Sequence, residues 1–436
     1  MYEFDFSDRS AVAAMALDEL SGSQYWLDDR VYSRAFGSTV ASEVADLLSI
    51  AMGCYAADRL SPRGLAWHRD FVLRIDVADP QRWRGVGGDL SGFLKLLTDD
   101  EWNFEFVEGR RARVSELQGT LFPELLRCDA SVGLFSGGLD SLVGAARVLE
   151  SSDRQLVLLG ARSSPVIGRD QHRQAIALRL RYPGKIIEIG VPLHLRESVS
   201  LEKTQRTRSF LYLALGVAAA ITGGASKVEV FENGYGAYNP RLDEHQLGTQ
   251  ANRGTHPYVL ARFARLMARA NLSVDVALPH QGESKAEHVA HLPNELLHLV
   301  SLTSSCDSYP LRRSGVTHCG RCGSCILRRQ SLLAAGLEGS DRDDYEFEPF
   351  EHPVAAGEIC VRSARQAWLF GQLASADRWS DIEALWPSFG LDPDIGWPER
   401  ALVLRLMATL HGEWEGIMDS HPRARSAFHW PESSAA

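Results

Sequence analysis

Residues 131–141 read SVGLFSGGLDS, and this stretch decides the fold class. The apolar run at 131–135 predicts a short buried strand, and residues 139–150 predict a helix. Two consecutive glycines, Gly137 and Gly138, lie between them and allow a tight turn that brings the backbone close to a ligand. The spacing matches neither GxxxxGK[ST] nor GxGxxG. It predicts an anion-binding turn, with an ordinary strand-to-helix turn as the alternative.

The turn supplies polar groups that suit a phosphate. Backbone N–H groups at a helix N-terminus attract anions, and Ser136 and Ser141 add hydroxyl donors. Asp140 repels an anion, so we expect it to hold Mg²⁺ or to orient a nucleotide. The candidate nucleotide-binding residues are Leu134, Phe135, Ser136, Gly137, Gly138, Leu139, Asp140 and Ser141.

Predicted strands and helices alternate after this turn. The strands are expected at 155–160, 185–191 and 227–232, and the helices between them at 170–181 and 209–221. This alternation predicts an α/β fold with a doubly wound parallel sheet that is covered on both faces. In such sheets ligands bind beyond the carboxyl ends of the strands, which is where the SGGLDS turn falls.

The sequence divides into three predicted regions. Residues 1–127 are expected to form an accessory α/β domain, with helices at 38–60 and 90–97 and strands at 70–78 and 102–108. Residues 128–337 form the central α/β domain, and residues 338–436 form a helical extension. The segments 365–386 and 400–414 of the extension place Trp on apolar helix faces. Packing on a core is the favoured interpretation, and a partner-binding surface is the alternative.

Composition places the chain among ordinary soluble globular proteins. Of its 436 residues, 45% are hydrophobic and 23% are charged. The formal net charge of -10 disfavours a protein that coats duplex nucleic acid. No apolar stretch is long enough to span a bilayer, and the first residues, MYEFDFSDRS, are too polar for a secretory signal. We therefore expect a cytoplasmic protein with no membrane partner.

Four of the seven cysteines lie close together in the sequence. Cys319, Cys322 and Cys325 form a CxxCxxC run, and Cys306 lies thirteen positions before it. This spacing predicts a structural zinc ion with four thiolate ligands, which leaves no open coordination position. An iron–sulfur cluster is the alternative, but the fourth Cys and the Pro that follow in ferredoxin-type motifs are absent. The remaining cysteines are expected to be small buried hydrophobic residues; they are Cys54, Cys128 and Cys360.

The SGGLDS turn resembles the signature of the PP-loop ATP pyrophosphatases, whose fold is the adenine nucleotide alpha hydrolase-like (HUP) fold. The resemblance implies that ATP is cleaved between its α- and β-phosphates, which gives pyrophosphate and an adenylated substrate. The stretch Ser284-Lys285, the cysteine motif and the element that begins at Arg208 narrow the similarity to 7-cyano-7-deazaguanine synthases (QueC) over residues 128–337. Members of that family adenylate 7-carboxy-7-deazaguanine, convert it with ammonia to the amide, and dehydrate the amide to the nitrile.

Two features depart from that family. The loop at 233–243 is longer and differs from the family pattern, and the two flanking regions have no counterpart in the short enzymes. This layout, together with LTDDEWNFEF at 97–106, resembles the larger QueC-like proteins of Qat-type antiphage operons. It implies an operon-encoded protein as the amine acceptor of a deazaguanine acid. The alternatives are a housekeeping nitrile synthase that uses ammonia and a non-catalytic assembly factor that keeps its ATP and zinc sites. The sequence leaves a homodimer open.

Several side chains are candidates for the reaction itself. Lys285 suits the charge that develops on an adenylate or on pyrophosphate, and we group it with Asp140 and Ser141 as the catalytic candidates. Arg206 and Arg208 lie at a predicted helix N-terminus, where a positive charge gains nothing from the helix dipole. Together with Asn233 of the altered loop, they are the candidate substrate residues. His280, His288 and His291 lie near Lys285 and are expected to be ordinary.

Overall fold

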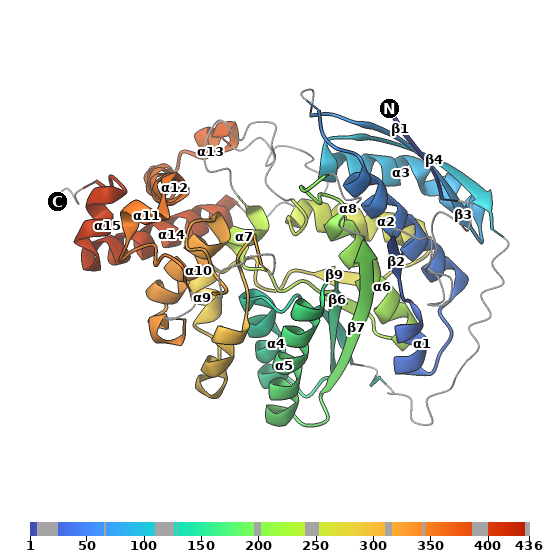
Figure 1. Cartoon of the computed structure of the whole chain (residues 1–436), viewed down its shortest axis with the longest axis horizontal. Coiled ribbons are helices and arrows are strands. Elements are labelled where there is room, and N and C mark those ends of the chain that lie inside the picture. The colour runs from blue at the N-terminus through green and yellow to red at the C-terminus, as the bar shows by residue number, and fades with distance from the viewer. Residues whose placement is uncertain are drawn as a thin grey trace. The chain divides into compact units, whose positions relative to one another are not determined.

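The fold is described from a computed structural model (Figure 1). The structure describes residues 1–6, 25–64, 67–109, 126–127, 129–195, 202–239, 253–309, 316–341, 345–385 and 400–431. Two compact units make up the chain: the first contains Met1–Ser136, Val148–Val230 and Gly254–Ala277, and the second contains Gly137–Arg147, Phe231–Arg253 and Leu278–Ala436. The chain passes from one unit to the other within the SGGLDS turn. The three regions expected from the sequence, with borders near 127 and 337, stay a prediction.

A six-stranded sheet organises the first unit. The strand order is β2-β7-β6-β5-β8-β9, and only the pairing of β2 with β7 is antiparallel. The strands are β2 (Tyr25–Leu27), β5 (Ser131–Leu134), β6 (Leu156–Arg162), β7 (Ile186–Leu195), β8 (Lys227–Glu229) and β9 (Asp275–Ala277). The expected α/β class with a parallel sheet is confirmed, and the arrangement is compatible with a PP-loop fold.

Helices connect the parallel strands as the alternation predicts. They are α4 (Leu139–Ser151), α5 (Pro165–Arg181) and α6 (Arg208–Gly223). Helix α5 begins five residues before its predicted start, because the Ser164 side chain accepts the Ile167 N–H and Pro165 takes the first helical position. Helix α6 is apolar on almost every face and is correspondingly buried.

A second, smaller sheet in the same unit has the parallel order β1-β3-β4. Its strands are β1 (Tyr2–Phe6), β3 (Asp70–Val77) and β4 (Glu101–Glu108), and the unit also contains α1 (Arg30–Phe36), α2 (Ser42–Leu60), α3 (Pro80–Thr98) and α8 (Pro257–Arg269). Helix α3 begins ten residues before the helix predicted at 90–97. Its first half contains glycines, which lower its helix propensity, whereas Asp79 caps its N-terminus by accepting the Arg82 N–H. Strand β1 was not predicted.

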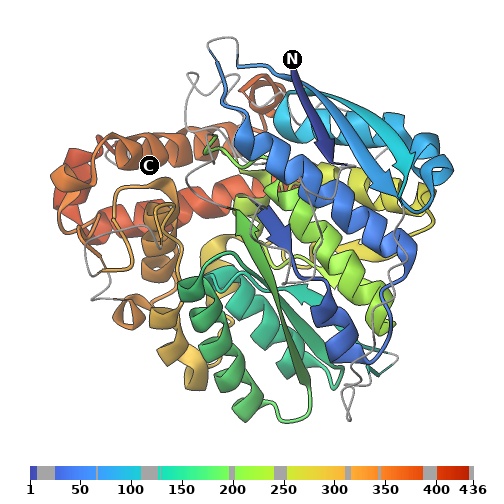
Figure 2. The same cartoon turned by 45° about the vertical axis from the view of Figure 1, so that its right-hand side comes forward.

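The second unit is mainly helical. Its helices include α7 (Gly234–Tyr238), α9 (Lys285–Val289), α10 (Gly323–Ala334), α11 (Pro353–Ala356), α12 (Glu358–Ser375), α13 (Trp379–Leu385), α14 (Arg400–Ser420) and α15 (Pro422–Ala427), with a 3-10 helix, η4, at Asn294–Leu302. Helices α12 and α14 lie side by side (Figures 1 and 2). Trp414 is buried in the core that these helices form, and the partly buried Trp368 packs against it, so packing on a core is confirmed for these two tryptophans.

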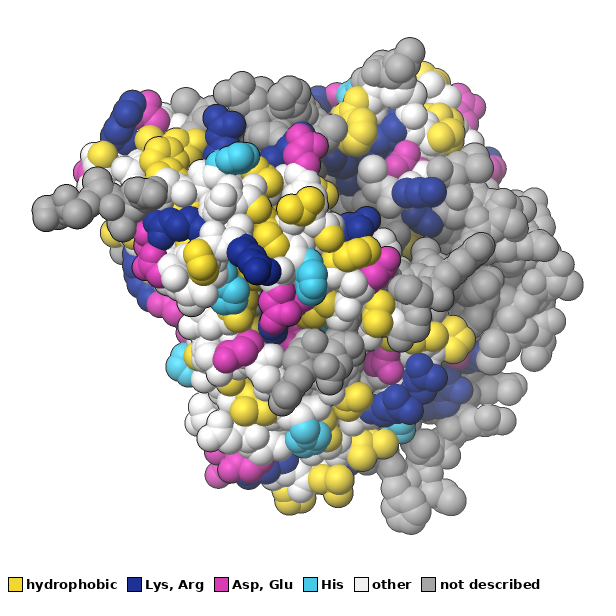
Figure 3. Space-filling model, turned by 60° about the vertical axis from the view of Figure 1, so that its left-hand side comes forward, with side chains coloured by type: hydrophobic (Ala, Val, Ile, Leu, Met, Phe, Trp, Pro, Cys, Tyr) yellow, Lys and Arg dark blue, Asp and Glu magenta, His cyan; other side chains and the backbone are white. Residues whose placement is uncertain are grey.

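The lone cysteines and the surface agree with a globular chain. Cys54 and Cys360 are buried, as expected, and Cys128 lies outside the described residues. Among the described helices, none is both long enough and apolar enough to cross a bilayer. On the face drawn in Figure 3, Lys and Arg side chains are interspersed with acidic and apolar side chains.

Candidate nucleotide and metal sites

The SGGLDS turn has the strand–turn–helix context that its sequence predicts. Strand β5 ends at Leu134 and α4 begins at Leu139. Gly137 has φ +82°, in the left-handed region that favours glycine. The Ser141 hydroxyl donates to the Gly138 carbonyl at 2.9 Å, and the Leu142 N–H bonds the same oxygen at 3.1 Å. The first turn of α4 is thereby closed with its N-terminus next to the glycines.

A pocket in the first unit adjoins the start of this turn. Its lining comes from β5, β6, α5 and α6 and consists of Leu134, Phe135, Ser136, Leu159, Ala161, Ile167, Gln171, Arg208, Tyr212 and Leu215. The Gln171 amide donates to the carbonyls of Phe135 and Ser136 at 3.1 and 3.2 Å. A Cβ at Gly160 would lie 2.6 Å from Oε1 of the Gln171 side chain, so the absence of a side chain at Gly160 makes room for Gln171. The pocket lies where parallel sheets bind ligands, beyond the strand ends.

The structure separates the two candidate substrate arginines. Arg208 lines the pocket, and its Nε donates to the Tyr212 hydroxyl at 2.9 Å. Arg206 instead stacks on the Trp67 ring at 5.0 Å and pairs with Asp99 at 3.5 Å. Burial and then the nearby Arg63 lower the pKa of Arg206. Of the two, only Arg208 is placed to meet a ligand of the pocket.

Three predicted residues meet in the second unit. Lys285, the first residue of α9, forms an ion pair with Asp140, and its side chain is buried. Asn233, the N-cap of α7, donates its amide to Asp140 Oδ1 at 2.9 Å. The same amide lies 2.9 Å from Glu232 Oε1. A cation, an amide and two carboxylates from three segments therefore surround one point.

Burial and charge set the protonation of this cluster. Burial alone would raise the pKa of Asp140, but Lys285 and then His288 hold it below its ordinary value. Burial, followed by the charge of Asp140, raises the pKa of Glu232 to about 8. The donor set fits Mg²⁺, which prefers carboxylate and phosphate oxygens. Asp140 and Glu232 are the side chains that would hold it.

Glu232 is not among the site residues predicted from the sequence. It lies at the end of the strand predicted at 227–232, whereas β8 ends at Glu229. A polar side chain beyond the carboxyl end of a parallel strand is the signal that could have identified it.

Replacing Glu232 with Gln is expected to change how stability depends on pH. The folded-state pKa of Glu232 is raised from 4.5 to about 8, so the wild type loses stability as the pH rises through this window. The loss is at most about 1.4 kcal/mol per pH unit for a single group. The variant should therefore match the wild type near pH 4.5 and exceed its unfolding free energy above pH 8. Urea unfolding in Mg²⁺-free buffer measures this, and parallel pH profiles would contradict it.

A histidine–carboxylate group supports the Asp140 backbone. His280, Glu283 and His288 have ligand atoms within 4.8 Å of one another. Arg147 donates through both terminal nitrogens to Glu283 and lies 3.3 Å from His288 Nδ1. His288 Nε2 contacts the Asp140 carbonyl at 3.2 Å. The guanidinium thus adds a positive charge to this group, and burial lowers the pKa of His280 to about 3.

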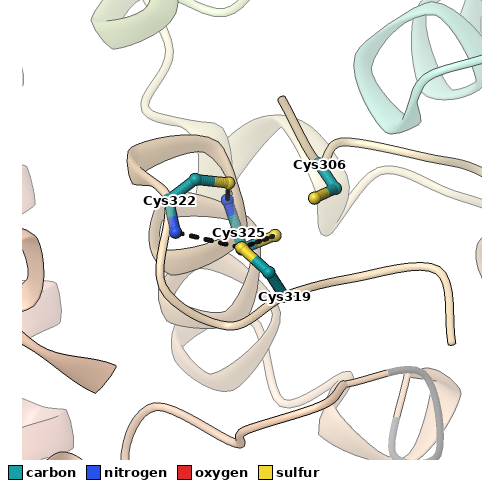
Figure 4. Close-up of side chains that lie close together, drawn as sticks. All are labelled: Cys306, Cys319, Cys322 and Cys325. Atoms are coloured by element: carbon teal, nitrogen blue, oxygen red, sulfur yellow. Dashed lines mark hydrogen bonds between the residues drawn. The ribbon is translucent and has the colours of Figure 1, made fainter. Parts of the chain in front are cut away.

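The four clustered cysteines converge on one centre (Figure 4). All four sulfur atoms lie within 4.8 Å of one another. Cys319 Sγ and Cys325 Sγ are 3.9 Å apart, which fits two ligands of a tetrahedral zinc ion, whose sulfurs at about 2.3 Å from the metal stand roughly 3.8 Å apart. The Cys319 sulfur accepts the N–H groups of Arg321 and Cys322 at 3.3 and 3.2 Å. The cluster could therefore hold zinc.

The two glycines of the cysteine motif have different roles. Gly320 has φ +72°, and a Cβ there would overlap the Phe347 carbonyl oxygen. Gly323 opens α10, and a Cβ there would meet nothing within 4 Å. Gly320→Ala should therefore distort the turn and lower both zinc content and melting temperature. Gly323→Ala is the matched control and should stabilise slightly, by up to about 1 kcal/mol. Equal effects of the two substitutions would contradict this assignment.

Comparison with known proteins gives a partial similarity. No family model matches the chain. The chain is 27% identical over 243 residues to a 7-cyano-7-deazaguanine synthase of Rhizobium etli strain CIAT 652, covering 49% of this chain and 91% of that protein. A second Rhizobium etli synthase, from strain CFN 42, is 28% identical over 249 residues, and that of Rhizobium rhizogenes strain K84 is 26% identical over 249 residues. Each covers 51% of this chain and 94% of the relative. Over about half of its length, this chain is similar to proteins named 7-cyano-7-deazaguanine synthase.

Proposed function

We propose that the protein uses ATP to adenylate a deazaguanine carboxylic acid and then transfers the acyl group to an amine. The similarity to 7-cyano-7-deazaguanine synthases supports the substrate class and an enzymatic role. One observation carries the proposal: Asp140 of the SGGLDS turn is held in a buried setting by Lys285 and Asn233. Asn233 is 93 residues and Lys285 is 145 residues away from Asp140 in the sequence. Their meeting therefore supports a site rather than a turn alone.

The adenylation step needs positioning and charge rather than a base. The carboxylate of the acid is already ionised near neutral pH, and its oxygen attacks the α-phosphorus, which breaks the bond to the pyrophosphate oxygen. The Ser136 hydroxyl and the backbone N–H groups at the start of α4 would donate hydrogen bonds to phosphate oxygens. The Ser141 hydroxyl would leave the Gly138 carbonyl to do the same. Lys285 stabilises the developing negative charge in its dry environment. Asp140 and Glu232 would hold Mg²⁺, which would supply further neutralisation of the phosphates.

The second step forms the C–N bond. An amine attacks the acyl carbon of the adenylate, AMP leaves, and the amine loses one proton. We propose a partner protein of a Qat-type antiphage system as the acceptor. Ammonia is the alternative, and it would lead to the amide and then, by dehydration, to the nitrile of a housekeeping synthase. Intact mass measurement distinguishes the two: the first gives a partner heavier by one acyl group, and the second gives a small-molecule nitrile.

Asp140→Asn should nearly abolish pyrophosphate release. The amide keeps the size of the side chain but removes the charge that Lys285 and a metal ion require, and the loss of such an electrostatic group costs about 100- to 1,000-fold in rate. We prefer Asn to Ala because Asn also keeps a side-chain oxygen that can accept a hydrogen bond from the buried Lys285 ammonium. The measurement is pyrophosphate release from ATP with and without 7-carboxy-7-deazaguanine.

Asp153→Asn is the matched control, because the Asp153 side chain is 93% exposed and pairs only with Lys185 among the ion pairs of the described residues. It should release pyrophosphate at the wild-type rate. Unchanged release by Asp140→Asn would overturn the nucleotide site. A wild-type protein that binds ATP but never releases pyrophosphate with the acid would favour the assembly-factor alternative.

A further inference from the structure

The helical extension contacts both segments whose side chains bind Asp140: the Lys285 segment and the Asn233 segment. We propose that Glu413 on α14 and Gln366 on α12 are positioning residues of the adenylation site. The inference rests on the proposed function for its catalytic consequence, and its structural part stands on contacts within the second unit. In this proposal, the extension fixes the position of the groups that bind Asp140.

The Lys285 segment is fixed by α14. Ser284 and Glu287 form a reciprocal capping box around the first turn of α9. Helix α14 adds a contact to each of them: the Ser284 hydroxyl donates to Glu413, and Arg405 forms an ion pair with Glu287. Arg405 also donates to the Gly282 carbonyl at 2.6 Å. A helix of five residues is only marginally stable by itself. The contacts with α14 therefore fix the position of Lys285, the first residue of α9.

The Asn233 segment is fixed by both helices of the extension. The Tyr235 hydroxyl donates to Gln366 Oε1 at 2.6 Å. Tyr238 is buried in the core formed with Phe370, Leu406 and their neighbours. A Cβ at Gly234 would overlap the Gln281 carbonyl oxygen and meet Leu406. The turn that presents the Asn233 amide to Asp140 is therefore embedded in the extension.

Glu413 also connects this framework to the cysteine cluster. Its second carboxylate oxygen accepts from Gln330 at 2.9 Å, and Gln330 is fully buried on α10, the helix that carries Cys325. One carboxylate thus joins α9, α10 and α14 through two hydrogen bonds that it accepts. A Gln at position 413 has one acceptor oxygen where two donors converge, so either the Ser284 hydroxyl or the Gln330 amide has to turn away from its present geometry.

Glu413→Gln should lower kcat about 10- to 100-fold, as expected for a small displacement of catalytic groups, with the KM for ATP changed less than about threefold. Glu415→Gln is the matched control: it makes the same chemical change two residues along α14, where Glu415 pairs with Arg425 and accepts from Trp430 within the extension. The control should lose stability but keep its kcat. Tyr235→Phe removes the other contact alone and should also lower kcat.

Recovery of kcat by a second substitution distinguishes a positioning role of Glu413 from a general loss of stability. In the double variant Glu413→Gln/Gln330→Glu, the carboxylate and the amide exchange places, so each donor again faces an acceptor. Recovery of at least roughly tenfold in kcat over the single variant is expected. A Glu413→Gln variant with wild-type kcat, or a Glu415→Gln variant with the same loss, would overturn the proposal.

Hydrogen exchange tests the positioning without any activity. Amides of residues 284–289 should exchange roughly tenfold faster in Glu413→Gln than in the wild type, and at the wild-type rate in Glu415→Gln. If the wild type shows no turnover, the proposed function fails while this measurement still decides the positioning. Unchanged exchange at 284–289 in Glu413→Gln would refute the inference even in an active enzyme.

Discussion

Replacing Cys322 with Ser is expected to yield protein that lacks zinc and whose second unit unfolds at a much lower temperature. The four sulfurs meet from two segments, with Cys306 on one and the other three in the turn before α10 and in its first residues. A structural zinc ion contributes its binding free energy to folding, about 10–16 kcal/mol in isolated zinc-finger peptides. Even a fraction of this exceeds the effect of most single substitutions. Metal analysis should find one zinc ion per wild-type chain.

Cys360→Ala is the control for the loss of a buried thiol, because Cys360 is buried in a hydrophobic core and is not one of the four clustered cysteines. It should lose about 1 kcal/mol or somewhat more and keep its zinc. Colourless wild-type protein is expected. Iron with visible absorbance would replace zinc by an iron–sulfur cluster, and full zinc content in Cys322→Ser would remove Cys322 from the ligand set.

The second large effect is expected at Arg328. Both Arg328 and Asp341 are fully buried, and their side chains pair at 2.9 Å. The guanidinium also donates to the Thr303 hydroxyl at 2.7 Å and to the Val300 carbonyl at 2.8 Å. Arg328→Met leaves the Asp341 carboxylate buried without its charge partner, which costs about 3–5 kcal/mol. Urea unfolding of the variant measures this loss.

Two further variants check the cause. Arg328→Met/Asp341→Leu removes both charges and should recover much of the stability, since a buried ion pair is often no better than packed apolar groups. Arg362→Met breaks an exposed pair with Glu358 and should cost about 0.5 kcal/mol or less. A single Arg328 variant as stable as Arg362→Met would show that the buried network adds little.

Local spacing explains what the sequence could predict. The SGGLDS turn and the CxxCxxC run are specified by neighbours a few residues apart, so their geometry follows from backbone preferences and ligand spacing. Long-range pairing cannot be obtained this way. Nothing in the sequence brings Glu232 to Asp140, or places Glu413 against Ser284, because these contacts depend on the tertiary packing of separate helices.

Misleading local signals account for the remaining differences. Residues 85–88 of α3 contain three glycines, which lower its helix propensity. The cap at Asp79 and packing outweigh the cost of about 1 kcal/mol for each glycine. The two arginines at 206 and 208 are two positions apart in the sequence but face different surroundings, since Arg206 precedes α6 and Arg208 opens it. Although both arginines lie at the N-terminus of α6, only Arg208 lines the pocket.

The antiparallel strand β2 has a consequence for any shortened form of this protein. It pairs with β7 at Leu193–Leu195, so Tyr25–Leu27 cover the end of this edge strand of the large sheet. A fragment that begins near residue 128 would expose the backbone N–H and C=O groups of β7 as a template for other chains. Such a fragment is expected to form insoluble aggregates even if every residue of the SGGLDS turn is intact. For this protein, solubility and catalysis depend on parts of the chain that are far apart in sequence.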